Sequence, residues 1–258
     1  MSNRPFILLS NDDGFDAKGL QFLIDGLASQ ARLMVVAPAY ERSGASHSIS
    51  LKVDMALQER APSHFAFDGT PVDCVQFGLR NLVPEKPDLI ISGINHGANL
   101  ANDTLYSGTV GAAMVGAAAG IPSIAVSLVD YRHKGENHFA NALTVLSELL
   151  KIWHHLDDFQ KRVININVPN IPAEEFRGIK VAQLGERIYG EEFHPGEIPN
   201  TFRYFHEEPI NFGGHDFDVT EIQNGFATLS VLRPSLFDAE KNRHLSDVLQ
   251  VEQKGRKP

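Results

Sequence analysis

Short apolar or β-branched runs that show no polar alternation constrain the fold of this chain most. They alternate with longer segments of helical periodicity, and they read FILLS, LMVVA, DLIIS, SIAVS and RVININV. A strand that is apolar on both faces must be covered on both faces, as in a parallel sheet between two layers of helices. We therefore predict strands at 6–10, 32–37, 88–92, 123–128 and 163–168, and helices at 17–29, 71–82, 109–119 and 138–153. This order is typical of an α/β fold with a Rossmann-like, three-layer core and a mostly parallel sheet.

Two regions depart from this alternation of predicted strands and helices. Residues 49–68 contain the alternating patches SLKVDMAL and HFAFD, which indicate an antiparallel pair of strands. After Pro169 several short strands follow one another without a helical crossover, and a polar helix ends the chain. We predict a catalytic core at 1–170 and a β-rich extension at 171–258 that packs on the same domain. The extension is positioned either to cap the site or to reach a neighbouring subunit.

The composition restricts which binding partners and which cellular compartment we expect for this chain. The net charge is −9, and the main basic cluster is Lys254, Arg256 and Lys257 at the tail, so a nucleic acid duplex is not an expected partner. An acidic protein that handles an anionic substrate needs local positive charge, and a bound cation supplies it. Cys74 is the only cysteine, and no apolar run has the length of a membrane span, which favours the cytoplasm and no membrane contact.

The first polar cluster, SNDDGFDAKGL, follows the first predicted strand directly. Asp12 and Asp13 are adjacent carboxylates that repel each other, and a site that keeps both ionised needs a cation. The alternative is that one of them caps the helix at 17–29. Asp16 is better placed for the cap, which leaves the pair for another role.

Two further clusters follow predicted strands at the same edge of the sheet. APAYERSGASHSIS offers Ser43 among several hydroxyls, although a plain solvated turn is the alternative. SGINHGANLANDTLYSGTVGAA is too long and too specific in its polar groups for an ordinary connection. Asn95 and Asn99 supply amide groups there. Ser107, Gly108 and Thr109 precede a predicted helix, where free N–H groups receive an anion; a simple Ser/Thr N-cap, which would account for Thr109, is the alternative.

Because these clusters follow parallel strands, we predict that they form one site. It would hold two carboxylates, a hydroxyl and an amide around a hard cation, with an anion cradle opposite. Such oxygen donors suit Mg²⁺ or Mn²⁺, whereas zinc favours His or Cys. His47 and His96 are interpreted as supporting or substrate-facing groups.

The motifs SNDDG, RSGAS, GTPVDCV, SGINHGAN and LYSGTVGAA, in this order and spacing, resemble the survival protein SurE family of metal-dependent 5′-nucleotidases. The likeness is close up to Leu128 and thinner beyond it. It implies a Rossmann-like core with a β-hairpin arm and a C-terminal extension exchanged between subunits in homodimers or homotetramers. It also implies hydrolysis of nucleoside 5′- and 3′-monophosphates.

Carried over motif by motif, the resemblance makes Asp12, Asp13, Ser43 and Asn95 the ligands of one divalent ion, Mg²⁺ or Mn²⁺ with Co²⁺ also possible. It makes Asn99 and the turn Ser107, Gly108, Thr109 the phosphate-binding groups. Asp12 and Asp13 are then the catalytic carboxylates, and Asp12 has three open roles: ligand, proton acceptor or nucleophile.

The sequence also departs from the family pattern. Ala101 and Asn102 stand where members often carry a Gly-Asp pair, and either Asp216 or Asp218 matches the Asp of a later Thr-Asp pair. The region from Gly190 to Gly214 is the hardest to match.

Two other hypotheses compete with this one. A haloacid-dehalogenase-type phosphatase also places an Asp after its first strand, but that chemistry requires Asp-x-Asp, and here the two carboxylates are adjacent. A nucleotide-binding module without catalysis would explain a Rossmann-like core. The chain has neither G-x-G-x-x-G nor a Walker A sequence, however, and a metal shell would be superfluous for binding alone.

Overall fold

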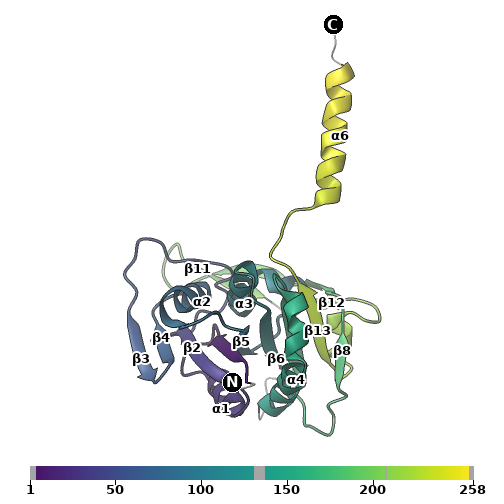
Figure 1. The fold of residues 1–258 in the computed structure, drawn as a ribbon. Coiled ribbons are helices and arrows are strands. Elements are labelled where there is room, and N and C mark those ends of the chain that lie inside the picture. The colour runs from purple at the N-terminus through teal and green to yellow at the C-terminus, as the bar shows by residue number, and fades with distance from the viewer. Residues whose placement is uncertain (1–3, 131–136, 207, 256–258) are drawn as a thin grey trace.

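A mixed sheet forms the centre of the protein, and its strand order is β3-β4-β2-β1-β5-β6-β7-β13-β8 (Figure 1). The computed structural model describes residues 4–130, 137–206 and 208–255. The parallel part confirms the predicted strands and consists of β4 (His64–Phe67), β2 (Arg32–Pro38), β1 (Phe6–Ser10), β5 (Leu89–His96), β6 (Ser123–Val129) and β7 (Val163–Pro169). The α/β class is therefore confirmed.

Successive side chains of β1 enter two separate cores, because neighbouring residues of a strand point to opposite faces. Ile7 and Leu9 pack with apolar residues of α1 (Lys18–Leu27) and α4 (Phe139–Lys151). Phe6 and Leu8 pack with those of α2 (Pro71–Phe77) and α3 (Gly108–Ala118). All five residues of β1 are buried, so the absence of alternation in FILLS reflects a strand covered on both faces.

Three predicted elements have clearly different bounds in the structure. The strand expected at 88–92 is β5, which extends to His96 and so includes Asn95. The helix expected at 71–82 is α-helical only to Phe77, and the π-helical segment η1 (Gly78–Leu82) continues it. The antiparallel pair predicted within 49–68 is β3 (Leu57–Ala61) with β4, so its first strand begins where the patch SLKVDMAL ends. The apolar residues Leu51 and Val53 of that patch are exposed.

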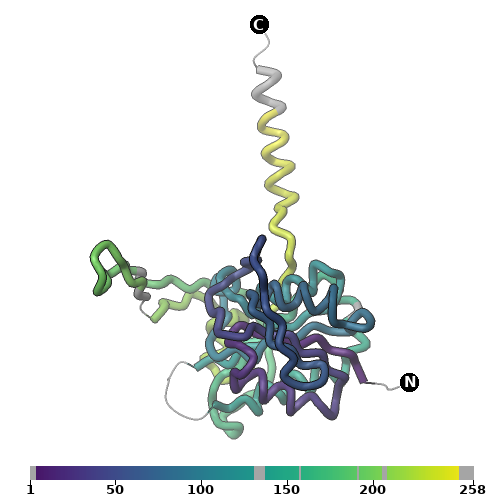
Figure 2. Tube along the Cα trace, turned by 90° about the vertical axis from the view of Figure 1, so that its left-hand side faces the viewer, coloured from purple at the N-terminus to yellow at the C-terminus, as the bar shows by residue number. Residues whose placement is uncertain are grey.

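Some of the residues after Pro169 form strands of the main sheet, and others form strands outside it. Strand β13 (Ala227–Leu232) pairs antiparallel with β7, and β8 (Ile179–Val181) pairs parallel with β13. Outside this sheet, β9 (Glu186–Ile188) pairs with β12 (Ile210–Phe212), and β10 (Glu191–Pro195) pairs with β11 (Phe202–His206). The β10-β11 hairpin forms an arm that projects from the body (Figure 2).

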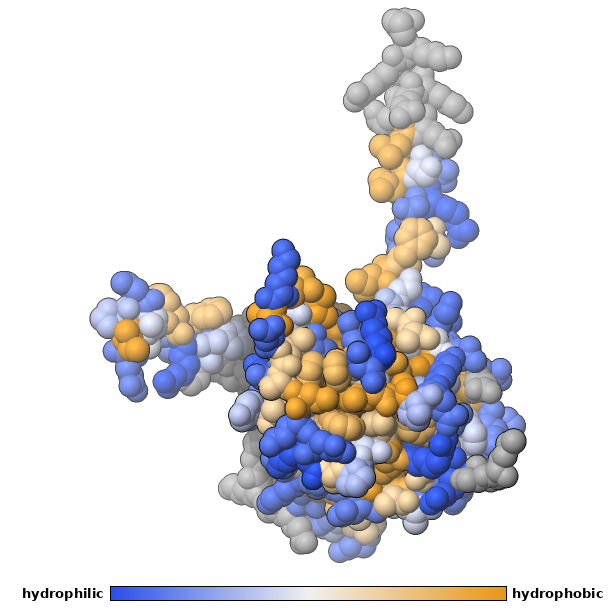
Figure 3. Space-filling view, turned by 60° about the vertical axis from the view of Figure 1, so that its left-hand side comes forward, coloured by the Kyte–Doolittle hydropathy of each residue, from blue (hydrophilic) through white to orange (hydrophobic). Residues whose placement is uncertain are grey.

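Short helices complete the described chain: η2 (Ala101–Leu105), η3 (Trp153–Phe159) and α5 (Asp218–Glu221). The last helix, α6 (Ala239–Gly255), stands away from the body (Figure 1) and exposes apolar side chains, as does part of the body surface (Figure 3). No helix in the described part of the chain combines the length and apolar composition of a membrane span.

Candidate active site

The site lies where the order in which the parallel strands are added to the sheet reverses, at β1. From β1 the chain proceeds to β2 on one side, and it later returns to place β5 on the other side. Ligands of open α/β sheets bind at such a reversal, beyond the carboxyl ends of the strands. The loops after β1 and β2 meet the end of β5 there: the Arg42 N–H donates to the Asp12 carbonyl at 2.7 Å, and the N–H of His96, the last residue of β5, donates to Asp13 Oδ2 at 2.9 Å.

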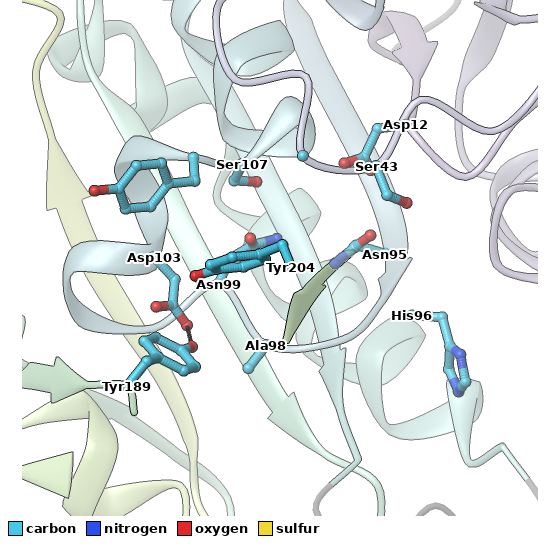
Figure 4. A pocket seen from close by; sticks show the side chains of 12 residues that line it. Asp12, Ser43, Asn95, His96, Ala98, Asn99, Asp103, Ser107, Tyr189 and Tyr204 are labelled. Carbon is cyan, nitrogen blue, oxygen red and sulfur yellow. Dashed lines mark hydrogen bonds between the residues drawn. The ribbon is translucent and has the colours of Figure 1, made fainter. Parts of the chain in front are cut away.

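A pocket of about 660 Å³ opens at this edge. Figure 4 shows Asp12, Ser43 and Asn95 facing a common space at one end of it, with Tyr189 and Asp103 at the other end. Its lining residues are Asp12, Ser43, Gly44, Asn95, His96, Ala98, Asn99, Asp103, Tyr106, Ser107, Tyr189 and Tyr204.

Asp12 is held in place by the start of helix α3. The Thr109 hydroxyl donates a hydrogen bond to Asp12 Oδ1. A Cβ at Gly108 would lie 3.0 Å from Asp12 Oδ2, so this glycine allows the backbone of the helix start to approach the carboxylate. Burial raises the pKa of Asp12 from 3.8 to about 6; the Thr109 hydrogen bond lowers it, and the charge of Asp13 raises it further. The structure therefore places a carboxylate where its ionised form is unfavourable without a cation.

Asp13 and Asn95 each use one polar atom within the protein. Asp13 Oδ2 accepts the His96 N–H, and Asn95 Nδ2 donates to the Gly97 carbonyl at 3.1 Å. Burial, the largest cause, raises the pKa of Asp13 above its usual value. A register shift between Ser92 and Asn95 interrupts the pairing of β5 with β6, and such irregularities change the direction of the side chains that follow.

The four predicted ligands each retain an oxygen, or oxygen lone pairs, beyond these contacts. Ser43 Oγ donates its proton to Glu41 at 2.9 Å, which leaves its lone pairs. The Thr109 hydroxyl binds Oδ1 of Asp12, the His96 N–H binds Oδ2 of Asp13, and the Gly97 carbonyl binds Nδ2 of Asn95, so these contacts do not use the second oxygen of either carboxylate or the amide oxygen. Partners that orient ligands in this way are usual around metal ions in proteins.

The surrounding charges also fit a cation. Within residues 4–130, 137–206 and 208–255, neither Asp12 nor Asp13 pairs with a lysine or arginine side chain. In the same ranges no three His, Cys, Asp or Glu side chains gather as a metal cluster. A metal here would therefore be bound by two carboxylates and neutral oxygens, which is a donor set for a hard ion such as Mg²⁺ or Mn²⁺.

Asn99 is fixed by a buried network of polar side chains. Its N–H donates to Asn167 Oδ1 at 2.9 Å, and its carbonyl accepts from the amides of Asn165 and Asn167 at 2.9 Å each. Its own Nδ2 donates to Ser127 Oγ at 2.8 Å. All four residues are buried, so the asparagine is held rigidly at the pocket wall.

The turn that begins α3 makes two kinds of contact: one residue caps the helix, and another orients Asp12. Ser107 is the N-cap, and its hydroxyl accepts from the Val110 N–H at 3.0 Å. The alternative of a Ser/Thr N-cap is therefore confirmed at Ser107, whereas the Thr109 hydroxyl does not cap the helix and binds Asp12. Ser107 lines the pocket, whereas Gly108 and Thr109 are not among its lining residues and lie next to Asp12. Phosphate binding by this turn stays a prediction.

The structure also tests the predictions for the cap of the first helix and for the two histidines. Asp16 does not cap α1, whose N-cap is Ala17 without a side-chain bond, and it pairs with Arg60 at 2.8 Å. Neither carboxylate of the pair caps that helix. His96 lines the pocket, but His47 lines a separate apolar groove.

Asp218 is a structural anchor. It is fully buried, and its carboxylate accepts the N–H groups of Ala101, Gly185 and Val219 at 2.8 Å each. Ala101 has a left-handed backbone with φ of 51°, a conformation that glycine adopts more easily, and its bond to Asp218 holds it there. Asp216 is exposed.

Four residues of the pocket wall were not predicted from the sequence: Asp103, Tyr106, Tyr189 and Tyr204. Tyr106 and Asp103 lie within the long loop already singled out, so their neighbours in LYSGT gave a signal. Tyr189 and Tyr204 come from the β-rich extension, where no local pattern connects them with the site.

Fold and site together define a Rossmann-like α/β protein with a carboxylate-lined pocket at the switch point of its sheet. Residues 7–191 match the model of the family described as Survival protein SurE. The chain is 40% identical to the 5′-nucleotidase SurE of Vibrio campbellii, over 95% of each chain. It is 37% identical to that of Campylobacter hominis, over 95% of this chain and 99% of the other.

A solved structure is similar as well. The crystal structure of the SurE protein from Aquifex aeolicus matches with a TM-score of 0.81 and 32% identity, covering 95% of this chain and 99% of that one. The chain therefore belongs to the survival protein SurE family.

Proposed function

We propose that the chain is a divalent-metal-dependent phosphatase that hydrolyses nucleoside 5′-monophosphates, and also 3′-monophosphates, to nucleoside and phosphate. The observation that carries this proposal is a pocket that Asp12 lines together with Asn99 and Ser107, the N-cap of α3; Asp13 is not among the lining residues and adjoins the pocket through Asp12 and through its bond to His96. Relatives named 5′-nucleotidase SurE support the same activity.

We further propose that Asp12, Asp13, Ser43 and Asn95 hold one divalent ion per subunit, Mg²⁺ or Mn²⁺, with Co²⁺ also accommodated. The oxygens they retain, and the absence of a lysine or arginine partner for the two carboxylates among the described residues, support this assignment. When bound, such an ion supplies positive charge to phosphoryl oxygens and acidifies water.

The residues of the chain bind and orient the phosphate. Asn99, fixed by its buried network, and the backbone N–H groups at the start of α3 neutralise the negative charge that develops on the phosphoryl group. Ser107 keeps that helix start in place through its bond to Val110. Thr109 orients Asp12 through its hydroxyl.

We also propose that the protein assembles as a homodimer or homotetramer and acts in the cytoplasm. Exposed apolar residues of the C-terminal extension support assembly: Leu236 is 94% exposed and Phe237 63% exposed. Burial of such side chains against a second copy is favourable. The single cysteine supports a reducing compartment.

Release of phosphate from AMP, measured with Mn²⁺ and again with excess EDTA, tests the proposed activity. We expect steady release with the ion, and a loss of at least a hundredfold with EDTA, because the carboxylate pair then lacks its cation. Restoration by added Mn²⁺ is the control. Turnover that is indifferent to EDTA would contradict the metal, and no turnover of any monophosphate would favour the binding module.

A further inference from the structure

One transverse row of the sheet connects the two halves of the proposed site. Asn95, a proposed metal ligand in β5, is the Cα partner of Ser127 in β6, and Ser127 is the Cα partner of Asn167 in β7. The side chains of Ser127 and Asn167 both bind Asn99, the proposed phosphate ligand. We propose that both are positioning residues, which set Asn99 at the distance from Asn95 that the reaction requires. The inference rests on the proposed function.

Asn167 holds the backbone of Asn99 as a neighbouring strand would. Its Oδ1 accepts the Asn99 N–H and its Nδ2 donates to the Asn99 carbonyl, both at 2.9 Å. Asn165, two residues earlier on the same face of β7, donates to that carbonyl as well, at 2.9 Å. Asn99 therefore cannot shift without leaving buried polar groups unpaired, which is costly.

Ser127 fixes the side chain of Asn99. Its Oγ accepts from Asn99 Nδ2 at 2.8 Å, and Ser127 is fully buried. An amide nitrogen carries two N–H groups, so this bond occupies one and leaves the other for a phosphoryl oxygen in the pocket that Asn99 lines. The direction of the second N–H depends on the bond to Ser127, because the last torsion of an asparagine side chain is otherwise loosely restrained.

The row also fixes the separation of the two ligands. Neighbouring strands of a sheet lie about 4.8 Å apart, and this spacing varies little. Asn95 belongs to β5 itself, whereas Asn99 is bound by side chains of β6 and β7. The loop that joins Asn95 to Asn99 is therefore held at both ends by one sheet. Metal and phosphoryl group require such fixed geometry, since small displacements lower the rate strongly.

The two asparagines of β7 have no packing advantage at their positions. Alternate residues of β7 enter the apolar core under α1 and α4, whereas Asn165 and Asn167 face the other side and are 0% and 1% exposed. A buried amide costs free energy unless it is hydrogen-bonded, so apolar residues would suit a strand that only had to pack. Both amides instead donate to Asn99. Neither Ser127 nor Asn167 lines the pocket, so both act through Asn99.

Exchange of Ser127 for alanine tests the inference with little change in packing. We expect Ser127→Ala to lower kcat for AMP about tenfold with the KM within about twofold, because Asn99 then loses its orientation toward charge that develops in the transition state. Ser123→Ala is the matched control. Ser123 is buried on the same face of β6, and its hydroxyl donates to the Ile121 carbonyl at 3.0 Å, at the strand end away from the pocket. Its kcat should stay within about twofold of the unaltered protein.

Asn167→Leu removes both bonds to the backbone of Asn99. It should lower kcat about a hundredfold, since a displacement of about 1 Å has effects of this size. Asn141→Leu is its matched control, because Asn141 is 5% exposed on α4 and its amide donates to the Ile171 carbonyl at 2.8 Å. Calorimetric titration with Mn²⁺ counts the competent sites of every variant, so that a partly unfolded sample is not taken for a slow enzyme.

Calorimetric titration with orthovanadate, with Mn²⁺ present, gives a readout that requires no hydrolysis. Vanadate adopts the five-coordinate geometry of a phosphoryl group in transfer, and transition-state analogues depend on the same contacts as the transition state. We expect Ser127→Ala and Asn167→Leu to weaken vanadate binding by about the factors by which they lower kcat. Binding of inorganic phosphate should change by less than about threefold.

A kcat for Ser127→Ala equal to that for Ser123→Ala would overturn the inference, as would equal weakening of vanadate and phosphate binding. Vanadate binding that depends on Ser127 and Asn167, without hydrolysis of any monophosphate, would reject the phosphatase and keep the positioning role. Hydrolysis of AMP with kcat unchanged in both variants would do the reverse.

Discussion

Replacing Asp12 by asparagine is expected to lower kcat/KM for AMP on the order of a thousandfold, which corresponds to about 4 kcal/mol of transition-state stabilisation. The substitution removes a full negative charge from the pair that we propose holds the ion. It also leaves the Thr109 hydroxyl opposite an amide instead of a carboxylate. Steady-state phosphate release with Mn²⁺ measures the effect.

Asp16→Asn is the matched control for this variant. Asp16 belongs to the same loop, but it is exposed and pairs with Arg60 at the surface. Exposed ion pairs contribute little, so the activity should stay within about twofold of the unaltered protein. If Asp12→Asn and Asp16→Asn lowered kcat/KM equally, Asp12 would have no special part in the reaction.

The same variant has a second expected effect, on the stability of the metal-free protein. The pKa of Asp12 is raised from 3.8 to about 6 in the folded state, so the folded state binds this proton more tightly than the unfolded state. The resulting stability is complete below pH 4 and is lost as the pH rises through 6.

With EDTA present, Asp12→Asn should therefore be more stable than the unaltered protein at pH 7, by roughly 3 kcal/mol at most. The two proteins should converge near pH 4. Urea unfolding at both pH values measures this difference, and a variant that is less stable than the parent at pH 7 would contradict the burial of an unpaired charge.

Asp218→Asn is expected to destabilise the fold by about 2–4 kcal/mol. Its carboxylate accepts three buried N–H groups, and an amide would turn an NH₂ group toward the Ala101 or the Gly185 donor. Because Ala101 belongs to the long loop after β5, the loss should also loosen the pocket and raise the KM for AMP.

Asp216→Asn is the matched control, since Asp216 is exposed and asparagine tolerates its positive φ of 67°. Chemical denaturation of both variants gives the two free energies of unfolding. A cost for Asp216→Asn as large as that for Asp218→Asn would show that the three buried hydrogen bonds are not the cause.

The core of the fold was accessible from sequence because its signals are local. FILLS and the other apolar runs lie on strands that are buried on both faces, and this pattern is visible within five to seven residues. The meeting of the three polar loops followed from parallel strands, since their carboxyl ends share one edge of the sheet.

Long-range contacts within the extension were not accessible in the same way. Strand β13 enters the main sheet antiparallel to β7, and nothing in ATLSVL specifies that partner. Tyr189 and Tyr204 reach the pocket from more than 80 residues beyond Asn99, through contacts such as that of Arg187 with Asp103. Their role depends on the tertiary structure, which local periodicity does not encode.

Within the site, residue types were predicted better than their individual bonds. The motif LYSGT indicated a helix start beside the carboxylates, but the assignment of capping to Ser107 and of the Asp12 contact to Thr109 depends on backbone geometry. Likewise, aspartate often caps helices, yet Asp16 forms an ion pair with Arg60 at the surface instead.

Diffraction from crystals grown with Mn²⁺, recorded for the anomalous signal of manganese, tests the central claim most directly. We predict one peak per chain, within about 2.6 Å of carboxylate oxygens of both Asp12 and Asp13, with Ser43 Oγ and Asn95 Oδ1 completing the shell. A peak at any other place, or none in crystals whose protein hydrolyses AMP with Mn²⁺, would contradict the account.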